Sequence, residues 1–175
     1  MKKHVGMRPQ DIAVLLKIVA LGEANWLGKD LAVALHISAS EVSESLRRSH
    51  FAGLIDSTKR AVRRQALLDF LVHGLRYVFP VQPGALVRGV PTAHSGPPLA
   101  ALIQSNEHFV WPHATGNVRG QSIEPLYPNA PDAALADPNL HELLALIDAL
   151  RIGRARERAA AITELQHRIL THELV

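Results

Sequence analysis

Residues 29–55 constrain the fold more than any other part of the chain, because two short amphipathic patterns stand there on either side of a break. They read KDLAVALHISASEVSESLRRSHFAGLI. Leu31 and Leu35 lie on one helical face, and Val42 and Leu46 repeat the same spacing after the break. We therefore expect two short helices that pack their apolar faces on a common core.

The ends of both helices are also marked in the sequence. Ser38 or Ser40 can cap the second helix, because a serine oxygen accepts a hydrogen bond from a free N–H of the first turn. Gly53 is typical of a residue that follows a helix. These signals predict helices over residues 28–35 and 39–52.

Two helices joined by a tight turn are the pattern of a helix-turn-helix unit, whose second helix enters the major groove of DNA. The stretch resembles winged helix-turn-helix transcription regulators of the MarR-like kind. The residues that carry the resemblance are Leu31-Ala32, Leu35-His36-Ile37-Ser38, Val42-Ser43, Leu46-Arg47-Arg48 and Gly53-Leu54-Ile55. His36 is a departure, because many members of the family have glycine in the turn, and a histidine with positive φ carries some conformational cost.

The resemblance implies that the second helix offers one face to DNA. Its inward side is expected to carry Val42, Leu46 and either Ser49 or Phe51. Its outward candidates for contact with base edges and nearby phosphates are Ser40, Ser43, Glu44 and Arg47. Arg47 could pair with guanine and Glu44 could accept from a cytosine amino group, although a solvated helix surface explains Glu44 equally well. Arg48 is expected to reach a phosphate.

The resemblance also implies a two-stranded wing after Ile55, for which the sequence leaves little room. Ser57 or Thr58 could cap a helix almost at once. We therefore predict a reduced or missing wing between Ile55 and Val62, and then a helix to about His73. Basic side chains crowd the start of that helix, namely Lys59, Arg60, Arg63 and Arg64. A phosphate-facing cluster is favoured over the alternative of a solvated surface.

Charge is distributed unevenly along the chain. The formal net charge is +3, yet residues 1–79 carry twelve Lys/Arg against seven Asp/Glu, a net of +5. Residues 80–138 carry two against four, and residues 139–175 carry five of each. The basic surplus lies on the segment with the helix-turn-helix pattern, as contact with phosphates requires. This distribution favours double-stranded DNA as the partner.

The N-terminus is basic and then apolar, which superficially suggests a signal peptide. Asp11, Lys17 and Glu23 interrupt the apolar run and no small-residue cleavage site follows, so we predict an ordinary helix over about residues 9–21. No apolar run is long enough to suggest a membrane span. The lack of cysteine excludes disulfides and is typical of a reducing cytoplasm, which is the compartment we expect.

Proline divides the chain into three parts. Ten of the eleven prolines fall between residues 80 and 138, a segment that cannot be mostly helix. We predict a winged helix-turn-helix domain over residues 1–90, an irregular proline-rich arm over 91–138 and a C-terminal helix over 139–175. The expected class is mainly α with a small β component.

Several short elements are expected within and beside the arm. Two β-prone runs, residues 75–79 and 85–90, predict a hairpin that could be a displaced wing. Residues 99–104 could form a short helical piece behind two prolines, and residues 109–112 have the features of an edge strand. The whole region is too apolar for a disordered linker.

The C-terminal segment carries leucine and isoleucine at helical spacing and is interrupted at Gly153, which leaves one long helix or two. Its arginines and glutamates balance, so a partner helix or a solvated face suits it better than DNA. Many regulators of the resembled kind pair through their terminal helices. The apolar stripes therefore lead us to expect a homodimer.

The leading hypothesis is thus a homodimeric, sequence-specific DNA-binding transcription regulator. The alternative is an antitoxin-like or adaptor protein whose arm and C-terminal helix bind a protein partner. An enzyme is disfavoured, because the chain has no HExxH, no phosphate-binding glycine loop and no GxSxG motif, and His94 beside Ser95 has no third member. No catalytic residue, metal site or cofactor is expected.

Overall fold

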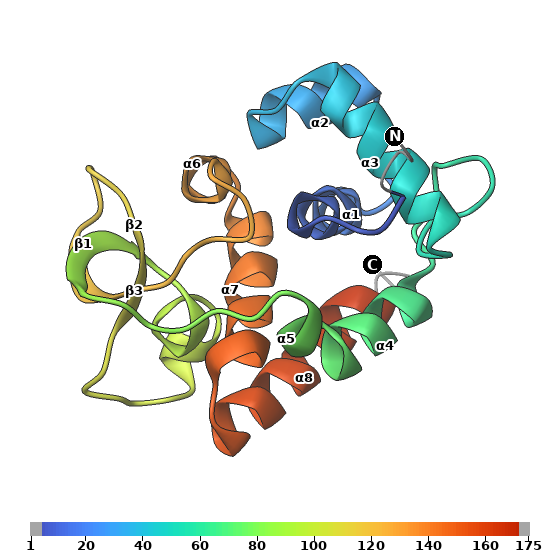
Figure 1. The fold of residues 1–175 in the computed structure, drawn as a ribbon. Helices are drawn as coiled ribbons and strands as arrows, with labels where there is room; N and C mark the ends of the chain where they lie inside the picture. Colours follow the sequence, from blue (N-terminus) through green and yellow to red (C-terminus); the bar gives the residue numbers. More distant parts are fainter. Residues whose placement is uncertain (1–4, 172–175) are drawn as a thin grey trace.

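The computed structural model describes residues 5–171 (Figure 1). Residues 1–4 and 172–175 lie outside the described part, and with them the end of the expected C-terminal helix. The described chain is mostly helical with one small three-stranded sheet, which confirms the expected balance of α and β structure. In these residues no helix is long and apolar enough to cross a membrane.

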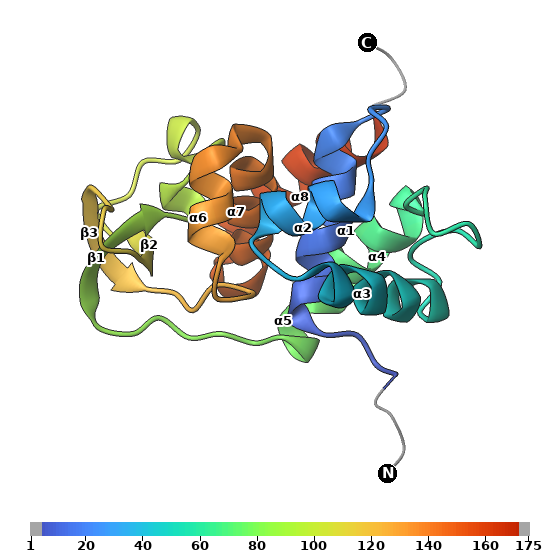
Figure 2. The same cartoon turned by 90° about the horizontal axis from the view of Figure 1, so that it is seen from above.

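The elements follow one another in a simple order. The helices are α1 (Pro9–Leu21), α2 (Gly28–Leu35), α3 (Ala39–Phe51), α4 (Arg64–His73), α5 (Leu75–Val78), α6 (Ala130–Ala136), α7 (Pro138–Ile152) and α8 (Ala155–Leu170). The strands are β1 (Leu86–Pro91), β2 (Phe109–Pro112) and β3 (Val118–Ser122), with short 3-10 turns η1 (Ala93–Ser95) and η2 (Leu99–Ala101). Helices α2 and α3 lie at one end of the molecule and the strands lie at another (Figures 1 and 2).

Helix α7 is the centre of the molecule. Residues 143–151 are all buried, and the helix packs against α1, α6, α8 and η1. The chain breaks after Ile152 at Gly153, so the C-terminal segment forms two helices instead of one. The leucine stripe that led us to expect a homodimer is therefore covered within a single chain, and it gives no support to pairing.

One hydrophobic core runs through all three parts of the chain. It includes Leu15 from α1, Trp111 from β2 and Leu165 from α8, which are 0%, 1% and 0% exposed. The boundaries expected after residues 90 and 138 therefore do not separate independent cores. The arm packs on the helices as an integral layer of the fold, and burial of its aromatic and aliphatic side chains stabilises it there.

The three strands close on one another. Strand β1 pairs antiparallel with both β2 and β3, and β2 pairs parallel with β3 over two residues. Glycine permits this close approach, because a Cβ on Gly89 would stand 1.9 Å from the carbonyl oxygen of Trp111. The expected strand over residues 109–112 is confirmed, but it has partners on both sides and is not an edge strand.

The prediction of a hairpin over residues 75–90 is wrong for its first strand. Residues 75–78 form α5, with Leu75 fully buried, while the expected strand over residues 85–90 is present as β1. Pro80 and Pro83 cannot donate ladder hydrogen bonds and leave the connecting segment extended. The partners of β1 come from β2 and β3 far along the chain, so residues 75–90 do not form a displaced wing.

The helices around the turn match the sequence-based boundaries closely. Ser38 caps α3, its Oγ accepting from the N–H of Glu41 at 3.1 Å, while the Glu41 carboxylate accepts from the N–H of Ser38 at 2.8 Å. This capping box holds the pKa of Glu41 below its ordinary value, mainly through the backbone hydrogen bond from Ser38. His36 has φ +55°, so it does occupy the left-handed conformation that usually favours glycine.

A very short hairpin follows α3 in the segment for which the sequence predicts a reduced or missing wing. Ile55 and Val62 form a single antiparallel bridge. Asp56 organises the loop between them, because its carboxylate accepts from the Thr58 hydroxyl at 2.6 Å and from the N–H groups of Arg60 and Ala61. These bonds, the one from Thr58 first, lower the pKa of Asp56 to about 2.

The environment of His141 on α7 leads us to expect that the free energy of unfolding depends measurably on pH. Its Nε2–H donates to the carbonyl of Pro91 at 2.8 Å, and burial lowers the pKa of the ring. The folded chain therefore resists protonation at His141, whereas the unfolded chain takes up a proton as the pH falls through about 6.5. We expect the free energy of unfolding to fall below that pH, by about 1.4 kcal/mol for each unit that separates the folded and unfolded pKa values.

Urea denaturation between pH 7.5 and pH 5 would measure this dependence. His141→Gln should flatten the profile, because its amide can still donate to Pro91 and does not titrate. His50→Gln, at an exposed position on α3, should leave the profile unchanged. A wild-type profile equal to that of His141→Gln would contradict the prediction.

Candidate nucleic-acid interface

Helix α3 lies on the outside of the molecule, and among residues 5–171 no other helix or strand lies over its outer side (Figures 1 and 2). Its exposed side includes Ser40 and Ser43, while Val42, Leu46 and Ser49 face the core at 1%, 9% and 0% exposure. Ser49 is thus the inward residue of the two alternatives. The other, Phe51, is 71% exposed, so its expected inward orientation is wrong.

Arg47 and Glu44 form an ion pair on the outer face of α3. The Arg47 Nη2 donates to Glu44 Oε2 at 2.8 Å, and both side chains remain about one third exposed. At this exposure such a pair contributes little to stability. Its arginine could therefore exchange the carboxylate for another acceptor, such as a guanine edge, at small cost.

Arg48 does not lie on the surface, and the expectation that it reaches a phosphate is wrong. Its side chain is 4% exposed, and its Nε and Nη2 donate to the two carboxylate oxygens of Asp11 at 2.8 Å and 2.7 Å. The hydrogen bond with Asp11 raises the pKa of Arg48. A fixed fork of donors matches a carboxylate in this bidentate manner, so Arg48 joins α3 to α1 inside the protein.

The basic cluster after α3 divides into two pairs. Lys59 and Arg63 have no hydrogen bond or ion pair from their side chains to any residue between 5 and 171, and Arg63 is exposed. Arg60 instead donates to the carbonyl of Trp26 at 2.6 Å, and Arg64 donates to the carbonyl of Ile169 at 2.9 Å. Of these four side chains, Lys59 and Arg63 are the two without a partner in residues 5–171, whereas Arg60 and Arg64 each use one donor on a backbone carbonyl.

The arm supports the turn between α2 and α3, which sequence reasoning missed. The Tyr127 hydroxyl donates to the carbonyl of Leu35 at 3.1 Å, and the Asn129 amide donates to the carbonyl of His36 at 2.7 Å. Burial raises the pKa of Tyr127. These donors satisfy carbonyls at the end of α2 that no helical N–H can reach. No local signal could have revealed the contact, because the partners are more than ninety residues apart.

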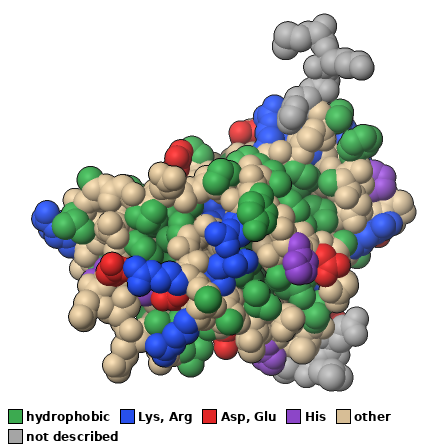
Figure 3. Space-filling model, turned by 60° about the horizontal axis from the view of Figure 1, so that its bottom comes forward, with side chains coloured by type: hydrophobic (Ala, Val, Ile, Leu, Met, Phe, Trp, Pro, Cys, Tyr) green, Lys and Arg blue, Asp and Glu red, His purple; other side chains and the backbone are tan. Residues whose placement is uncertain are grey.

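The face of the molecule formed by α4, α5 and α8 also carries basic side chains, but in a different arrangement (Figure 3). Basic side chains on this face lie among hydrophobic and acidic ones and do not form one continuous patch. Arg168 on α8 donates to the carboxylates of Glu142 and Glu164. This face therefore does not present one continuous basic surface.

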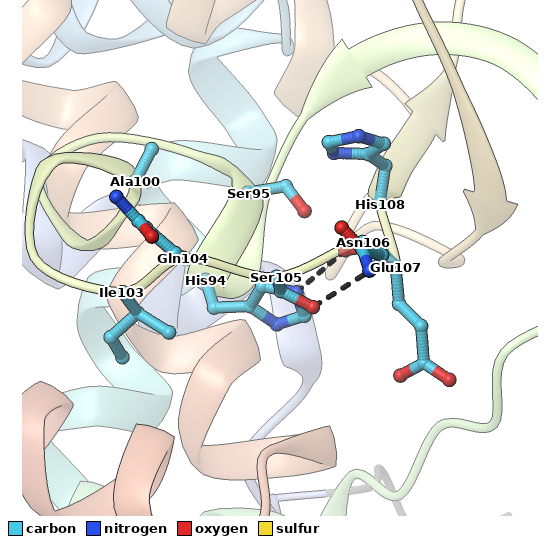
Figure 4. Close-up of a pocket in the computed structure, with 9 residues that line it drawn as sticks. All are labelled: His94, Ser95, Ala100, Ile103, Gln104, Ser105, Asn106, Glu107 and His108. Carbon is cyan, nitrogen blue, oxygen red and sulfur yellow. Dashed lines mark hydrogen bonds between the residues drawn. The ribbon is translucent and has the colours of Figure 1, made fainter.

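A cleft of about 470 Å³ lies between η1 and the loop before β2 (Figure 4). His94 at its wall is 5% exposed, and its Nε2–H donates to the carbonyl of Glu107 at 2.8 Å. Ser95 accepts from the N–H of Phe109 at 2.9 Å. The histidine and the serine thus have separate partners, and nothing in this geometry would activate the hydroxyl as a nucleophile.

The described residues hold no group of three or more His, Cys, Asp or Glu side chains that could bind a metal ion. Comparisons with known proteins add no identification. Neither the family models nor the curated proteins nor the solved structures contain a match to this chain. The geometry of α3 and its surroundings is therefore the basis on which a function is inferred.

Proposed function

We propose that the chain is a sequence-specific DNA-binding protein that regulates transcription, with α3 as the helix that enters the major groove. The observation that carries this proposal is the uncovered outer face of α3, held at its start by a capping box and joined to α2 by a tight turn. An exposed, well-anchored helix after a tight turn is what major-groove recognition requires.

Four side chains on α3 are suited to base edges. Ser40 and Ser43 carry exposed hydroxyl groups that can donate or accept. Arg47 would leave Glu44 and bind a guanine through its planar fork. Glu44 could accept from a cytosine amino group, and its charge would also oppose non-specific attraction to phosphates. Selectivity would then rest on a few contacts from one helix.

Lys59 and Arg63 would contact the phosphates that flank the groove. Both are unengaged in the described chain, and they stand in or just after the short hairpin that follows α3. Two such contacts supply a modest, salt-dependent affinity. The proposal concerns a single copy of the chain, because the leucine stripe of α7 that suggested a homodimer is buried within it.

The experiment is selection of bound duplexes from a random pool at two salt concentrations, followed by affinity measurements on variants. Arg47→Ala should cost about 1–3 kcal/mol of discrimination at one base position. Lys59→Ala with Arg63→Ala should weaken binding to all duplexes and reduce the salt slope by about one for each lost phosphate contact. Arg119→Ala on the distant strand β3 removes the same charge and should change neither property.

Two outcomes would count against the proposal in different ways. Enrichment of no sequence at either salt concentration would remove the function itself. Enrichment with unchanged binding in the Arg47, Lys59 and Arg63 variants would place the interface elsewhere on the surface.

A protein partner is the second candidate, and exposed apolar side chains favour it. Val33 on α2 and Phe51 on α3 are 78% and 71% exposed. Large apolar side chains in contact with water are typical of protein interfaces. In this case the chain would act as an adaptor or antitoxin-like protein, and Phe51→Ala would weaken capture of the partner while leaving DNA binding unchanged.

A further inference from the structure

A second concave site lies at the foot of the short hairpin, away from the outer face of α3. It has a volume of about 250 Å³ and is enclosed by the end of α1, the connector that follows it, and the segment that leads into α4. Its lining brings together Trp26, Arg60 and Arg64 with the aliphatic side chains of Ile18 and Val19. Segments forty residues apart in the sequence thus form one small cavity.

Both guanidinium groups are held in place by the protein. Arg60 donates one N–H to the carbonyl of Trp26 at 2.6 Å, and its guanidinium carbon Cζ lies 3.9 Å from the centre of the Trp26 ring. Arg64 donates one N–H to the carbonyl of Ile169 at 2.9 Å. Stacking on an aromatic ring and a hydrogen bond to a carbonyl hold a guanidinium group in place without neutralising its charge.

Within residues 5–171, most of the hydrogen-bonding capacity of these arginines is unused. Each guanidinium has five N–H donors, and each has a single hydrogen bond between the described residues. Glu23 is the one carboxylate in the lining, and it is exposed to solvent. The start of α4 adds to the positive potential, because its first turn has neither an acidic residue nor a side-chain cap.

We propose that this cavity binds a small free oxyanion, a phosphoryl or carboxylate group, between Arg60 and Arg64. Two planar forks that face one cavity match the oxygens of such a group in bidentate fashion. The volume is below the usual range for drug-sized ligands, so the site would hold little more than the anionic group itself. A bound anion would join the hairpin, the start of α4 and the connector after α1.

The test is a titration of the full-length chain with inorganic phosphate and with pyrophosphate, at constant ionic strength set with sodium chloride. Trp26 lies at the site and should report binding as a saturable change in fluorescence. Trp111 is 1% exposed, donates to Asp148 and should not respond. Binding should also raise the melting temperature, since a ligand that binds only the folded chain stabilises it.

Four arginine variants test the assignment. Arg60→Gln and Arg64→Gln should each weaken pyrophosphate binding about tenfold or more, because each removes charge-assisted hydrogen bonds. Arg63→Gln is the matched control, because it removes the same charge one residue from Arg64 but does not line the cavity. Arg60→Lys keeps the charge and loses the planar fork, so it should also weaken binding in a chain that folds normally.

A phosphate of the DNA backbone has the same chemistry, and a competition experiment separates the two sources. If pyrophosphate binds and leaves DNA affinity unchanged at constant ionic strength, the site serves a free ligand, and this result stands even if the chain binds no DNA. Competition between the two, with Arg60→Gln weakening both, would assign the arginines to the DNA backbone and overturn the proposal. Absence of a saturable response, or an equal loss in Arg63→Gln, would overturn it as well.

Discussion

Replacing Asp148 with alanine is expected to lower the free energy of unfolding by about 3–5 kcal/mol. Asp148 is 1% exposed on α7, and its Oδ2 accepts from the Thr92 hydroxyl and the Trp111 indole, each at 2.7 Å. Its Oδ1 accepts from Arg151 at 2.9 Å. Burial raises the pKa of Asp148, and Arg151 and the three donors oppose that shift. Alanine would leave a buried guanidinium without its counter-charge.

The same network explains why the loss should be global. Arg151 also donates to the carbonyls of Phe79 and Glu124, so the Asp148 site joins α7 to the strands and to the segment after α5. Urea denaturation followed by circular dichroism would measure the change. Asp69→Ala is the control, since Asp69 is exposed on α4 and should change stability by no more than about 0.5 kcal/mol. Equal effects at the two positions would contradict this account.

Asp11→Ala is expected to have a comparably large effect, again about 3–5 kcal/mol. Asp11 is 0% exposed and is the bidentate partner of Arg48, and it also accepts from the N–H of Arg8 at the start of α1. Its loss would strand a buried arginine and remove a cap from α1. Chemical denaturation of the variant, beside the exposed control Asp69→Ala, would measure the loss.

A double substitution separates the structural role of Arg48 from a role in DNA binding. Asp11→Leu combined with Arg48→Met replaces the ion pair by apolar side chains of similar size, and such replacements are often neutral or stabilising. We expect most of the stability to return, and the affinity for a selected duplex to match the wild type. If the double variant folds but binds DNA as weakly as the Lys59→Ala variant does, Arg48 is instead a phosphate contact.

The support that the arm gives to α2 bears on how the proposed DNA-binding surface is maintained. Tyr127 and Asn129 donate hydrogen bonds to the carbonyls at the end of α2, and α6 packs against the same helix. The orientation of α3 relative to the rest of the protein therefore depends on residues that a local reading assigns to a separate arm. The arm and the turn belong to one structural unit.

The amino-acid sequence by itself determined the local elements of this protein. Three features follow from interactions between residues a few positions apart: the apolar spacing in α1, α2 and α3, the cap at Ser38 and the short turn after Ile55. Such interactions leave a periodic or positional signal in the sequence. The uncovered serines of α3 were predicted for the same reason, because the face opposite a regular apolar stripe must point away from the core.

Only the tertiary structure decided which charged side chains are available. Arg47 and Arg48 are neighbours in the sequence, yet one is exposed beside Glu44 and the other is buried against Asp11. The pairing of β1, the burial of α7 and the contacts of Arg60 and Arg64 were decided in the same way. Each depends on partners distant in sequence, whose desolvation and hydrogen bonding exist only once the core has formed.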